Sequence, residues 1–316
     1  MALAKALQDN LRIPLIGAPM FIVSQPDLVI AQCKAGIVGA FPALNARPPA
    51  LLDDWLGRIR EELEAHASEH PDEPVAPFAV NQIVHGSNAR LKEDVEACVR
   101  HKVPVVITSV GAPGAVVDAV HSYGGLVFHD VINIRHARKA ISEGVDGLIA
   151  VCAGAGGHAG TLSPFALVKE IREEYDGTLI LSGAMSKGSD ILAAQAMGAD
   201  LAYFGTRFIA TEEATAVPAY KEMLVDSKAV DIVYTDLFTG ILGNYLKASI
   251  VNAGLDPDDL PDKEGDGAMF ASTGAKAWKD VWGAGQGVGG IDSIVPTRDL
   301  VLRLEQEYRE AKERLL

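Results

Sequence analysis

The chain has 316 residues, of which 48% are hydrophobic and 22% charged, a composition typical of folded globular proteins. Its length is about twice that of an average domain, but single α/β barrels reach this size. The 42 acidic and 28 basic side chains give a formal charge of −14, which argues against nucleic acid or an anionic membrane as a partner. The sequence has no apolar run of the ~18 residues that a membrane span requires, and its first fifteen residues lack the apolar core of a signal peptide.

The cysteines indicate a reducing compartment. Cys33, Cys98 and Cys152 are odd in number and show no CxxC spacing, which disfavours a disulfide framework or a thiolate zinc site. No HExxH motif, P-loop motif or cluster of cysteine and histidine suggests another metal or nucleotide site. We therefore expect a cytoplasmic protein without a bound metal.

The negative charge is concentrated in two short stretches. Residues 53–73 carry a net charge of −6 and residues 256–266 carry −5, so the rest of the chain is close to neutral. The overall acidity therefore says little against an anionic ligand that binds elsewhere.

Eight short apolar runs recur through the first two thirds of the chain. They are continuous, without the polar alternation of a strand that has one exposed face, and so predict strands covered on both sides. The predicted strands are 13–17, 37–41, 77–80, 105–108, 126–129, 147–151, 178–181 and 201–204.

Stretches with helical periodicity separate these strands. The clearest are 51–64, 89–100, 115–122, 135–143, 164–174 and 189–197. From the first to the last strand the repeat is about 27 residues. Eight strand–helix units at this spacing predict a (β/α)₈ TIM barrel. A doubly wound open sheet is the competing interpretation, which the strand count and spacing make less suitable.

The repeating pattern stops near residue 210. We therefore expect residues 1–210 to form the barrel and residues 211–280 a C-terminal helical cap or insertion. Within this cap, helices are predicted over 219–225, 237–251 and 269–278. Residues 281–316 are expected to supply a glycine-rich loop and a final helix, 296–315, that returns to the barrel.

In a TIM barrel the active site forms where the strands end, at their carboxyl ends. The loops after the seventh and eighth strands contain Gly183, Gly205 and Thr206. Glycines and a hydroxyl in these two loops are typical of a phosphate site, since backbone N–H groups can approach the phosphate oxygens closely. The alternative is that these glycines only allow tight turns.

A histidine follows the sixth strand within the stretch Ala155-Gly156-Gly157-His158-Ala159-Gly160. The glycines leave little bulk around one imidazole, the side chain whose ordinary pKa suits proton transfer near neutral pH. His158 is therefore the candidate catalytic residue, although a lone loop histidine is more often a solvated surface residue. Tyr203 is interpreted as a core residue, and Tyr234 and Tyr245 as residues lining the substrate entrance.

Four motifs together resemble the nitronate monooxygenase family, formerly called 2-nitropropane dioxygenase. They are AGGHAG, SGAM after the seventh strand, FGTRF after the eighth and VWGAGQGVGGI near the C-terminus. The family is similar to FMN-dependent enoyl-ACP reductases and NADH:quinone reductases. The resemblance extends over most of the chain and implies a TIM barrel that contains FMN.

The resemblance also implies roles for individual residues. Those expected around the flavin ring are Ala18, Met20, Asn81, Asp130, Gly156 and Gly157. Those expected to hold the 5′-phosphate are Gly183, Ala184, Gly205 and Thr206, with Ala184 supplying its backbone N–H. Those expected to close the pocket are Gly285 and Gln286. His158 would face the substrate above the ring.

Two departures from the reductase relatives affect the expected chemistry. Asp130 occupies a position where many of them carry a lysine near the flavin N1 and C2 oxygen, and a carboxylate cannot stabilise a reduced anionic ring. Residues 239–247 lack the arginines that some of those relatives carry there, which makes acidic or acyl-carrier substrates less favoured.

The preferred functional hypothesis is the oxidation of alkyl nitronates with O₂ to a carbonyl compound and nitrite. One alternative is an NAD(P)H-dependent FMN reductase of quinones or enoyl thioesters. Another is a barrel that binds FMN or a different phosphorylated ligand without catalysis. The expected partners are thus small molecules, with O₂ or NAD(P)H, and a homodimer is compatible with the sequence.

Overall fold

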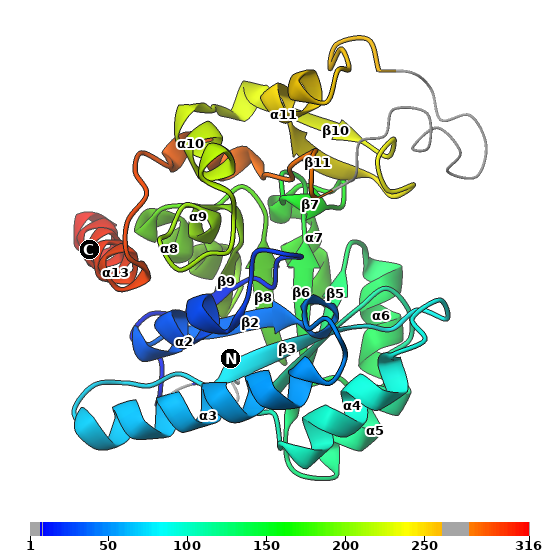
Figure 1. Ribbon diagram of the computed structural model, residues 1–316, viewed down its shortest axis with the longest axis vertical. Helices are drawn as coiled ribbons and strands as arrows, with labels where there is room; N and C mark the ends of the chain where they lie inside the picture. The colour runs from blue at the N-terminus through cyan, green and yellow to red at the C-terminus, as the bar shows by residue number, and fades with distance from the viewer. Residues whose placement is uncertain (1–6, 8, 261–277, 316) are drawn as a thin grey trace.

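A computed structural model describes residue 7, residues 9–260 and residues 278–315. Its centre is a closed barrel in which all neighbouring strands are parallel (Figure 1). The strands, in order around the barrel, are β1 (Leu15–Gly17), β2 (Val38–Pro42), β3 (Phe78–Ile83), β4 (Val105–Ser109), β5 (Leu126–Val131), β6 (Gly147–Val151), β8 (Thr178–Ser182) and β9 (Leu201–Phe204). The predicted TIM barrel is confirmed, and each of these strands overlaps a predicted one.

The strands are buried on both faces, which explains their continuous apolar sequences. Alternate residues point into the barrel, where Ile107, Phe128 and Ile180 belong to one interior cluster. The residues between them, such as Val106 and Val127, belong to a second cluster that includes side chains of the surrounding helices. Parallel register aligns Ile107 of β4 with Phe128 of β5, so neighbouring strands contribute to the same interior level.

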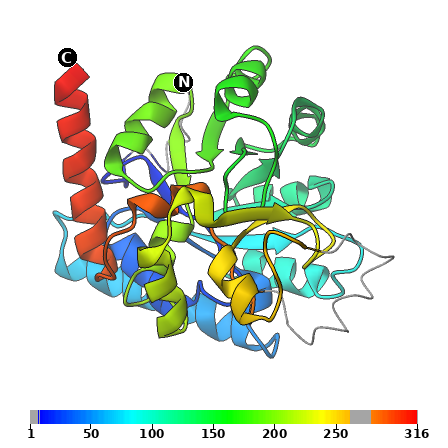
Figure 2. The same cartoon turned by 90° about the horizontal axis from the view of Figure 1, so that it is seen from above.

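Helices cover the outside of the barrel (Figure 2). They are α2 (Pro26–Lys34), α3 (Leu51–Glu69), α4 (Leu91–Arg100), α5 (Gly114–His121), α6 (Ile134–Ser142), α7 (Pro164–Arg172), α8 (Gly188–Met197) and the last helix, α13 (Thr297–Leu315). Helix α13 packs against α8 and α2, so the C-terminal part of the chain lies against the barrel helices. Helix α2 was not among the predicted helices. Within the described ranges, no helix has both the length and the apolar character needed to cross a membrane.

The segment expected to form a helical cap contains strands as well as helices (Figure 1). A short helix α9 (Thr206–Ile209) leads to α10 (Pro218–Asp226), β10 (Ile232–Thr235), β11 (Gly243–Leu246) and α11 (Lys247–Asn252). Strand β11 lies between β10 and β7 (Gly157–His158) and pairs antiparallel with both.

The prediction of a continuous helix over 237–251 is wrong. Gly240 has a φ of 75°, which ends any local helix, and the following residues hydrogen-bond to β10 and β7 instead. Helix formation resumes only at Lys247. The predicted helix over 269–278 lies outside the described residues except for Trp278.

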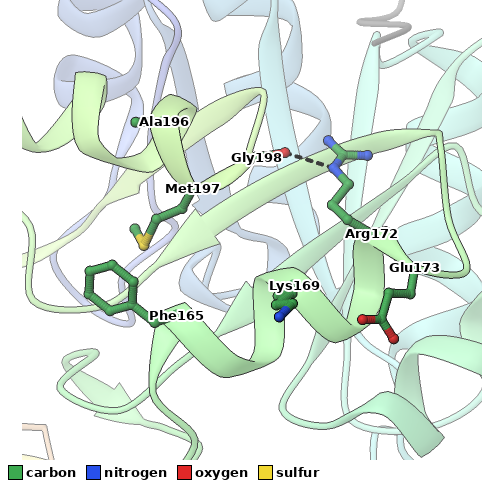
Figure 3. A pocket seen from close by; sticks show the side chains of 7 residues that line it. All are labelled: Phe165, Lys169, Arg172, Glu173, Ala196, Met197 and Gly198. Carbon is green, nitrogen blue, oxygen red and sulfur yellow. Dashed lines mark hydrogen bonds between the residues drawn. The ribbon is translucent and has the colours of Figure 1, made fainter.

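An open surface depression lies between α7 and α8, away from the carboxyl ends of the strands (Figure 3). Arg172, at its edge, donates hydrogen bonds to the carbonyl oxygens of Gly198 and Gly177, each at 2.7 Å. Its Nη2 also contacts the buried carboxylate of Asp200 at 2.6 Å, and this carboxylate accepts the Leu179 N–H at 2.8 Å. The guanidinium is thus fully engaged in joining α7 to the starts of β8 and β9.

We expect Asp200→Ala to lower the free energy of unfolding by about 3 kcal/mol, since it leaves a partly buried guanidinium and a backbone N–H without their acceptor. Urea unfolding followed by circular dichroism measures this change. Lys169→Ala, at an exposed position of the same depression, should alter stability by less than about 0.5 kcal/mol. Equal effects of the two substitutions would show that the ion pair is not structurally important.

Candidate active site at the carboxyl end of the barrel

A layer of polar side chains lies above the apolar interior of the barrel. It consists of Asn81, Ser109, Asp130 and Tyr203, which come from β3, β4, β5 and β9. Each follows an interior apolar residue of its own strand by two positions, as Asp130 follows Phe128. Because side chains of a strand alternate between its faces, all four point into the barrel. We call these four residues the polar layer.

Hydrogen bonds connect three members of the polar layer. Asn81 Nδ2 donates to Ser109 Oγ at 2.8 Å and to the Ile107 carbonyl at 3.3 Å. Ser109 Oγ in turn donates to Asp130 Oδ2 at 2.5 Å. Asp130 Oδ1 and the Tyr203 hydroxyl are buried and have no hydrogen-bond partner among the described residues. Both atoms lie at the carboxyl end of the barrel, where active sites of this fold form, so a group bound there could complete their hydrogen bonding.

The environment shifts the titration of Asp130 toward its neutral form. Burial raises the pKa of its carboxyl group from 3.8 to about 6, although the hydrogen bond from Ser109 lowers it. Burial also raises the pKa of Tyr203 well above 10, and the nearby Asp130 adds to this shift. The Tyr203 hydroxyl therefore keeps its proton and is available as a donor.

Three glycine-rich loops interlock beside the polar layer. Gln286 N–H donates to the Gly154 carbonyl at 2.9 Å, and Gly285 N–H donates to Thr206 Oγ1 at 2.9 Å. A Cβ atom on Gly156 would lie only 2.8 Å from Gly285 N and 3.0 Å from Thr206 Oγ1. Glycine at position 156 therefore allows the close approach of three loops, namely those after β6 and β9 and the one near the C-terminus.

The loop after β8 differs in one detail from the expectation. Gly183 and Ala184 both have positive φ angles, of 135° and 55°. The Ala184 N–H, expected to bind phosphate, donates to the Gly154 carbonyl at 3.3 Å instead. This amide therefore helps to join the loops after β6 and β8.

Two basic side chains beside these loops contact other parts of the chain. Lys187 Nζ lies 3.9 Å from the carboxylate of Glu307. Arg207 is fully buried and donates from Nη1 to the Ser293 carbonyl at 3.3 Å. A phosphate in this cradle would instead meet backbone groups and the Thr206 hydroxyl, whose proton remains free to donate while its oxygen accepts a bond.

Residues after β1 complete the same end of the barrel. If Gly205 had a Cβ atom, this atom would lie 3.6 Å from Ala18 Cβ and 3.7 Å from Met20 Sδ. These three positions therefore adjoin one another. The loop continues to Ile22, which is exposed with a φ of 69°. Asn45 holds this conformation, which is unfavourable for a β-branched residue, by accepting the Ile22 N–H at 2.9 Å and donating to the Met20 carbonyl at 3.0 Å.

His158 stands at the entrance to this region, on β7. Its Nε2 lies 2.9 Å from Thr239 Oγ1, and its ring meets the Trp278 ring edge-to-face at 5.6 Å. Strand β11 fixes its backbone through the pairing with Gly243. The ring is accessible from the entrance, while the protein around it lowers the pKa of His158 below 6.5 by desolvation. A neutral imidazole can both accept a proton and donate a hydrogen bond.

A match to a family model decides what kind of protein this is. The model described as nitronate monooxygenase matches residues 58–307. The chain belongs to the nitronate monooxygenase family. The members of this family are flavoenzymes, and the chain is an oxidoreductase.

Individual relatives agree with this assignment over nearly the whole length. A nitronate monooxygenase of Paraburkholderia phytofirmans is 26% identical, over 96% of this chain and 94% of that protein. FabK from Thermotoga maritima superimposes with a TM-score of 0.78 at 25% identity, covering 98% of this chain and 96% of that one. A nitroalkane oxidase from Streptomyces ansochromogenes, at 24% identity, shares the fold with a TM-score of 0.79 over 99% of this chain and all of that one.

The family motifs meet at one end of this barrel. The residues that the resemblance assigned to the flavin and its phosphate are found in the polar layer, in the interlocked loops or after β1. Their individual contacts with a flavin remain predictions. The sequence interpretation of Tyr203 as an ordinary core residue was incomplete, because its hydroxyl belongs to the polar layer. Tyr245 does not line the entrance, since it is fully buried, whereas the Tyr234 hydroxyl bonds the Ala159 carbonyl.

Other residues of the site were given no role from the sequence. Ser109 follows the fourth predicted strand, and counting two positions from the interior Ile107 would have placed it in the barrel. Asn244 is buried and donates to the Ala155 carbonyl at 2.7 Å, which supports the loop that carries His158. Asn244 and Thr239 lie in the segment wrongly predicted to be one helix, so their positions had no sequence signal.

We expect Gly156→Ala to weaken flavin binding. Its methyl group would force apart the loops that contain Thr206 and Gly285, at a cost of roughly 1–3 kcal/mol, which corresponds to an affinity about 5- to 150-fold lower. Flavin absorbance retained after gel filtration measures the change. The control is Gly57→Ala in α3, where a Cβ atom has nothing within 4 Å and should stabilise the helix. Undiminished flavin retention in Gly156→Ala would contradict the close loop packing.

The polar layer predicts an unusual pH dependence of stability. Because the native pKa of Asp130 is about 6 and its ordinary value is 3.8, the native state holds this proton between about pH 4 and pH 6, where the unfolded chain releases it. The contribution of Asp130 to the free energy of unfolding therefore falls as the pH rises through this window.

Asp130→Asn removes this contribution. Urea unfolding of the apoprotein should show the variant more stable than the wild type at about pH 7, by up to about 3 kcal/mol, and no advantage below about pH 4. A stability difference that does not change with pH would show that Asp130 is not held neutral.

Proposed function

We propose that this protein is an FMN-dependent nitronate monooxygenase, which oxidises alkyl nitronates with O₂ to a carbonyl compound and nitrite. The observation that carries the proposal is His158, an accessible imidazole fixed at the barrel entrance by Thr239 and by strand pairing, next to the glycine loops and the polar layer. The family assignment supports the same class of chemistry. The three cysteines are buried and free, which suits the reducing cytoplasm that we propose as its location.

The residues at this end of the barrel suit FMN. The edge of an isoalloxazine ring carries N–H and carbonyl groups, which could satisfy the buried Asp130 Oδ1 and Tyr203 hydroxyl. The loops with Gly183 and Gly205 would admit the phosphate close to the backbone, and Thr206 would donate to it. When bound, FMN supplies the electron-accepting ring that exchanges electrons with the substrate and O₂.

The protein's own residues would bind and orient the substrate. A nitronate is an anion, and the neutral His158 ring can donate a hydrogen bond to one of its oxygens, a bond strengthened by the negative charge. With a neutral nitroalkane, the same imidazole can accept the proton from the α-carbon. Thr239 fixes the ring through Nε2, while the exposed apolar Ile22 and Val110 follow β1 and β4 and offer contacts for an alkyl group.

The alternative is reduction by NAD(P)H of a quinone or an enoyl thioester on the same barrel. The likeness to FabK keeps this alternative open. Against it, the polar layer has a carboxyl group and no cation. Thr239 and Asn244, which surround His158 and its loop, belong to a segment without arginine.

The proposal predicts nitrite release from propyl-2-nitronate by the purified yellow protein, above the rate with free FMN. His158→Ala should lower kcat/KM about 10- to 100-fold with the nitronate, because it loses one hydrogen bond to a charged group. It should lower kcat/KM about 10²- to 10⁴-fold with 2-nitropropane, because that substrate also needs a base. His70→Ala, an exposed histidine at the end of α3, is the control.

Anaerobic mixing distinguishes the two functions. The nitronate should bleach the flavin faster than NADH or NADPH does. Rapid bleaching by a reduced nicotinamide, with no nitrite from any nitronate, would replace the proposed function with the reductase alternative.

A further inference from the structure

The two polar atoms without partners in the polar layer come from separate strands. Asp130 is on β5 and Tyr203 on β9, which are not neighbours in the barrel, and both side chains point into its interior. Both lie at the carboxyl end of the barrel, and Asp130 adds to the raised pKa of Tyr203. Their shared position at the carboxyl end places the unpaired atoms at the floor of the flavin site.

Among the residues that the structure describes, no positive charge compensates Asp130. Its Oδ2 accepts one hydrogen bond, from the neutral Ser109 on β4, and Asn81 on β3 reaches it only through that serine. The ionisable group that faces it from β9 is Tyr203. His129, its neighbour on β5, points to the opposite face and bonds Thr108 Oγ1 at 2.8 Å.

An ionised carboxylate at this position would therefore be buried with a single hydrogen bond, which is a high-energy state. A protonated carboxyl group accepts the Ser109 bond at one oxygen and has one O–H to donate from the other. In the structure Oδ1 is the oxygen without a partner. The proton of the neutral carboxyl group can therefore lie on Oδ1, the same oxygen that is free to bond a ligand.

We propose that Asp130 in its protonated form donates a hydrogen bond from Oδ1 to the edge of the flavin ring, so that its proton is linked to reduction of the ring. This inference rests on the proposed FMN site but not on the identity of the substrate. Ser109 acts as a positioning residue, because its hydroxyl fixes Oδ2 and thereby directs Oδ1.

The linkage has a defined proton balance. Reduction brings two electrons from the reductant, and the ring takes up its own proton and becomes more negative. Below the pKa of Asp130 the carboxyl group already holds its proton. Above that pKa Asp130 must take one further proton from solvent as the ring is reduced, since a carboxylate beside the reduced ring would be repelled. The equilibrium constant for reduction then falls by an additional factor of ten per pH unit. This lowers the two-electron reduction potential by about 30 mV per pH unit.

The experiment is a redox titration of the FMN-loaded protein with dithionite and a reference dye, over a range from about pH 5 to about pH 9. A plot of the wild-type reduction potential against pH should show a break. Above the break the potential should fall by about 30 mV more per pH unit, because one further proton is taken up. Asp130→Asn keeps an N–H donor but cannot ionise, so its potential should lack this break. The same pH dependence in both proteins would overturn the proposal.

Ser109→Ala provides a second test. It removes the hydrogen bond that stabilises the carboxylate, so the break should move to higher pH. Ser142→Ala, in α6 on the outside of the barrel, should leave the break unchanged. A break that stays in place in Ser109→Ala would argue against Asp130 as its origin.

An infrared difference spectrum between the oxidised and reduced protein gives an independent readout. Below the pKa of Asp130 its carboxylic-acid carbonyl band should shift on reduction, and above that pKa the band should appear on reduction. Both signals should be absent in Asp130→Asn. These measurements use no nitronate, so an absence of nitrite release would not affect them. A wild-type protein that stays colourless after reconstitution with FMN would overturn both the cofactor assignment and this inference.

Discussion

The two-residue period of the barrel strands is the constraint on which the site depends. Phe128 closes the interior with apolar contacts, and the next residue on the same face, Asp130, must therefore point into the barrel as well. The same relation holds for Ile107 and Ser109. The strands that form the core thus also set the direction of the polar groups above it, and no loop is needed to aim them. The carboxyl group fixed in this way has its Oδ1 buried, and this burial raises its pKa.

The second part of the site depends on chain segments that are far apart in sequence. Thr206, after β9, accepts a bond from Gly285, and Gly154, after β6, accepts one from Gln286. Each of these contacts uses backbone groups at close range, and small residues at the crossing points allow it. The cofactor cradle is therefore a property of three loops together. This arrangement explains why Ala184, expected to bind phosphate directly, instead bonds to a neighbouring loop.

Sequence reasoning identified the barrel because its evidence is local and repeated. Continuous apolar runs indicate strands that are covered on both faces, and eight of them at regular spacing indicate closure. The same reasoning failed over 237–251, where an apolar pattern was interpreted as a helix. There Gly240 and the pairing of β11 with β7 decide the structure, and pairing across some eighty residues leaves no local signal. For the same reason Thr239 and Asn244 were missed. The sequence correctly placed Tyr203 in the core. Whether its hydroxyl finds a partner depends on the residues on the opposite side of the barrel, which the sequence does not identify.

The position of Gly285 and Gln286 near the end of the chain bears on the order of synthesis. Strand β9 ends at Phe204 and supplies the last partner of β1, so the emerging chain holds every strand of the barrel before residue 285 is made. The contacts between the loops beside that barrel cannot yet form, because they use the N–H groups of Gly285 and Gln286, which have not yet been synthesised. During this interval the contacts between these loops are incomplete. In the finished chain they are supplied by one short stretch that is made after every strand of the barrel.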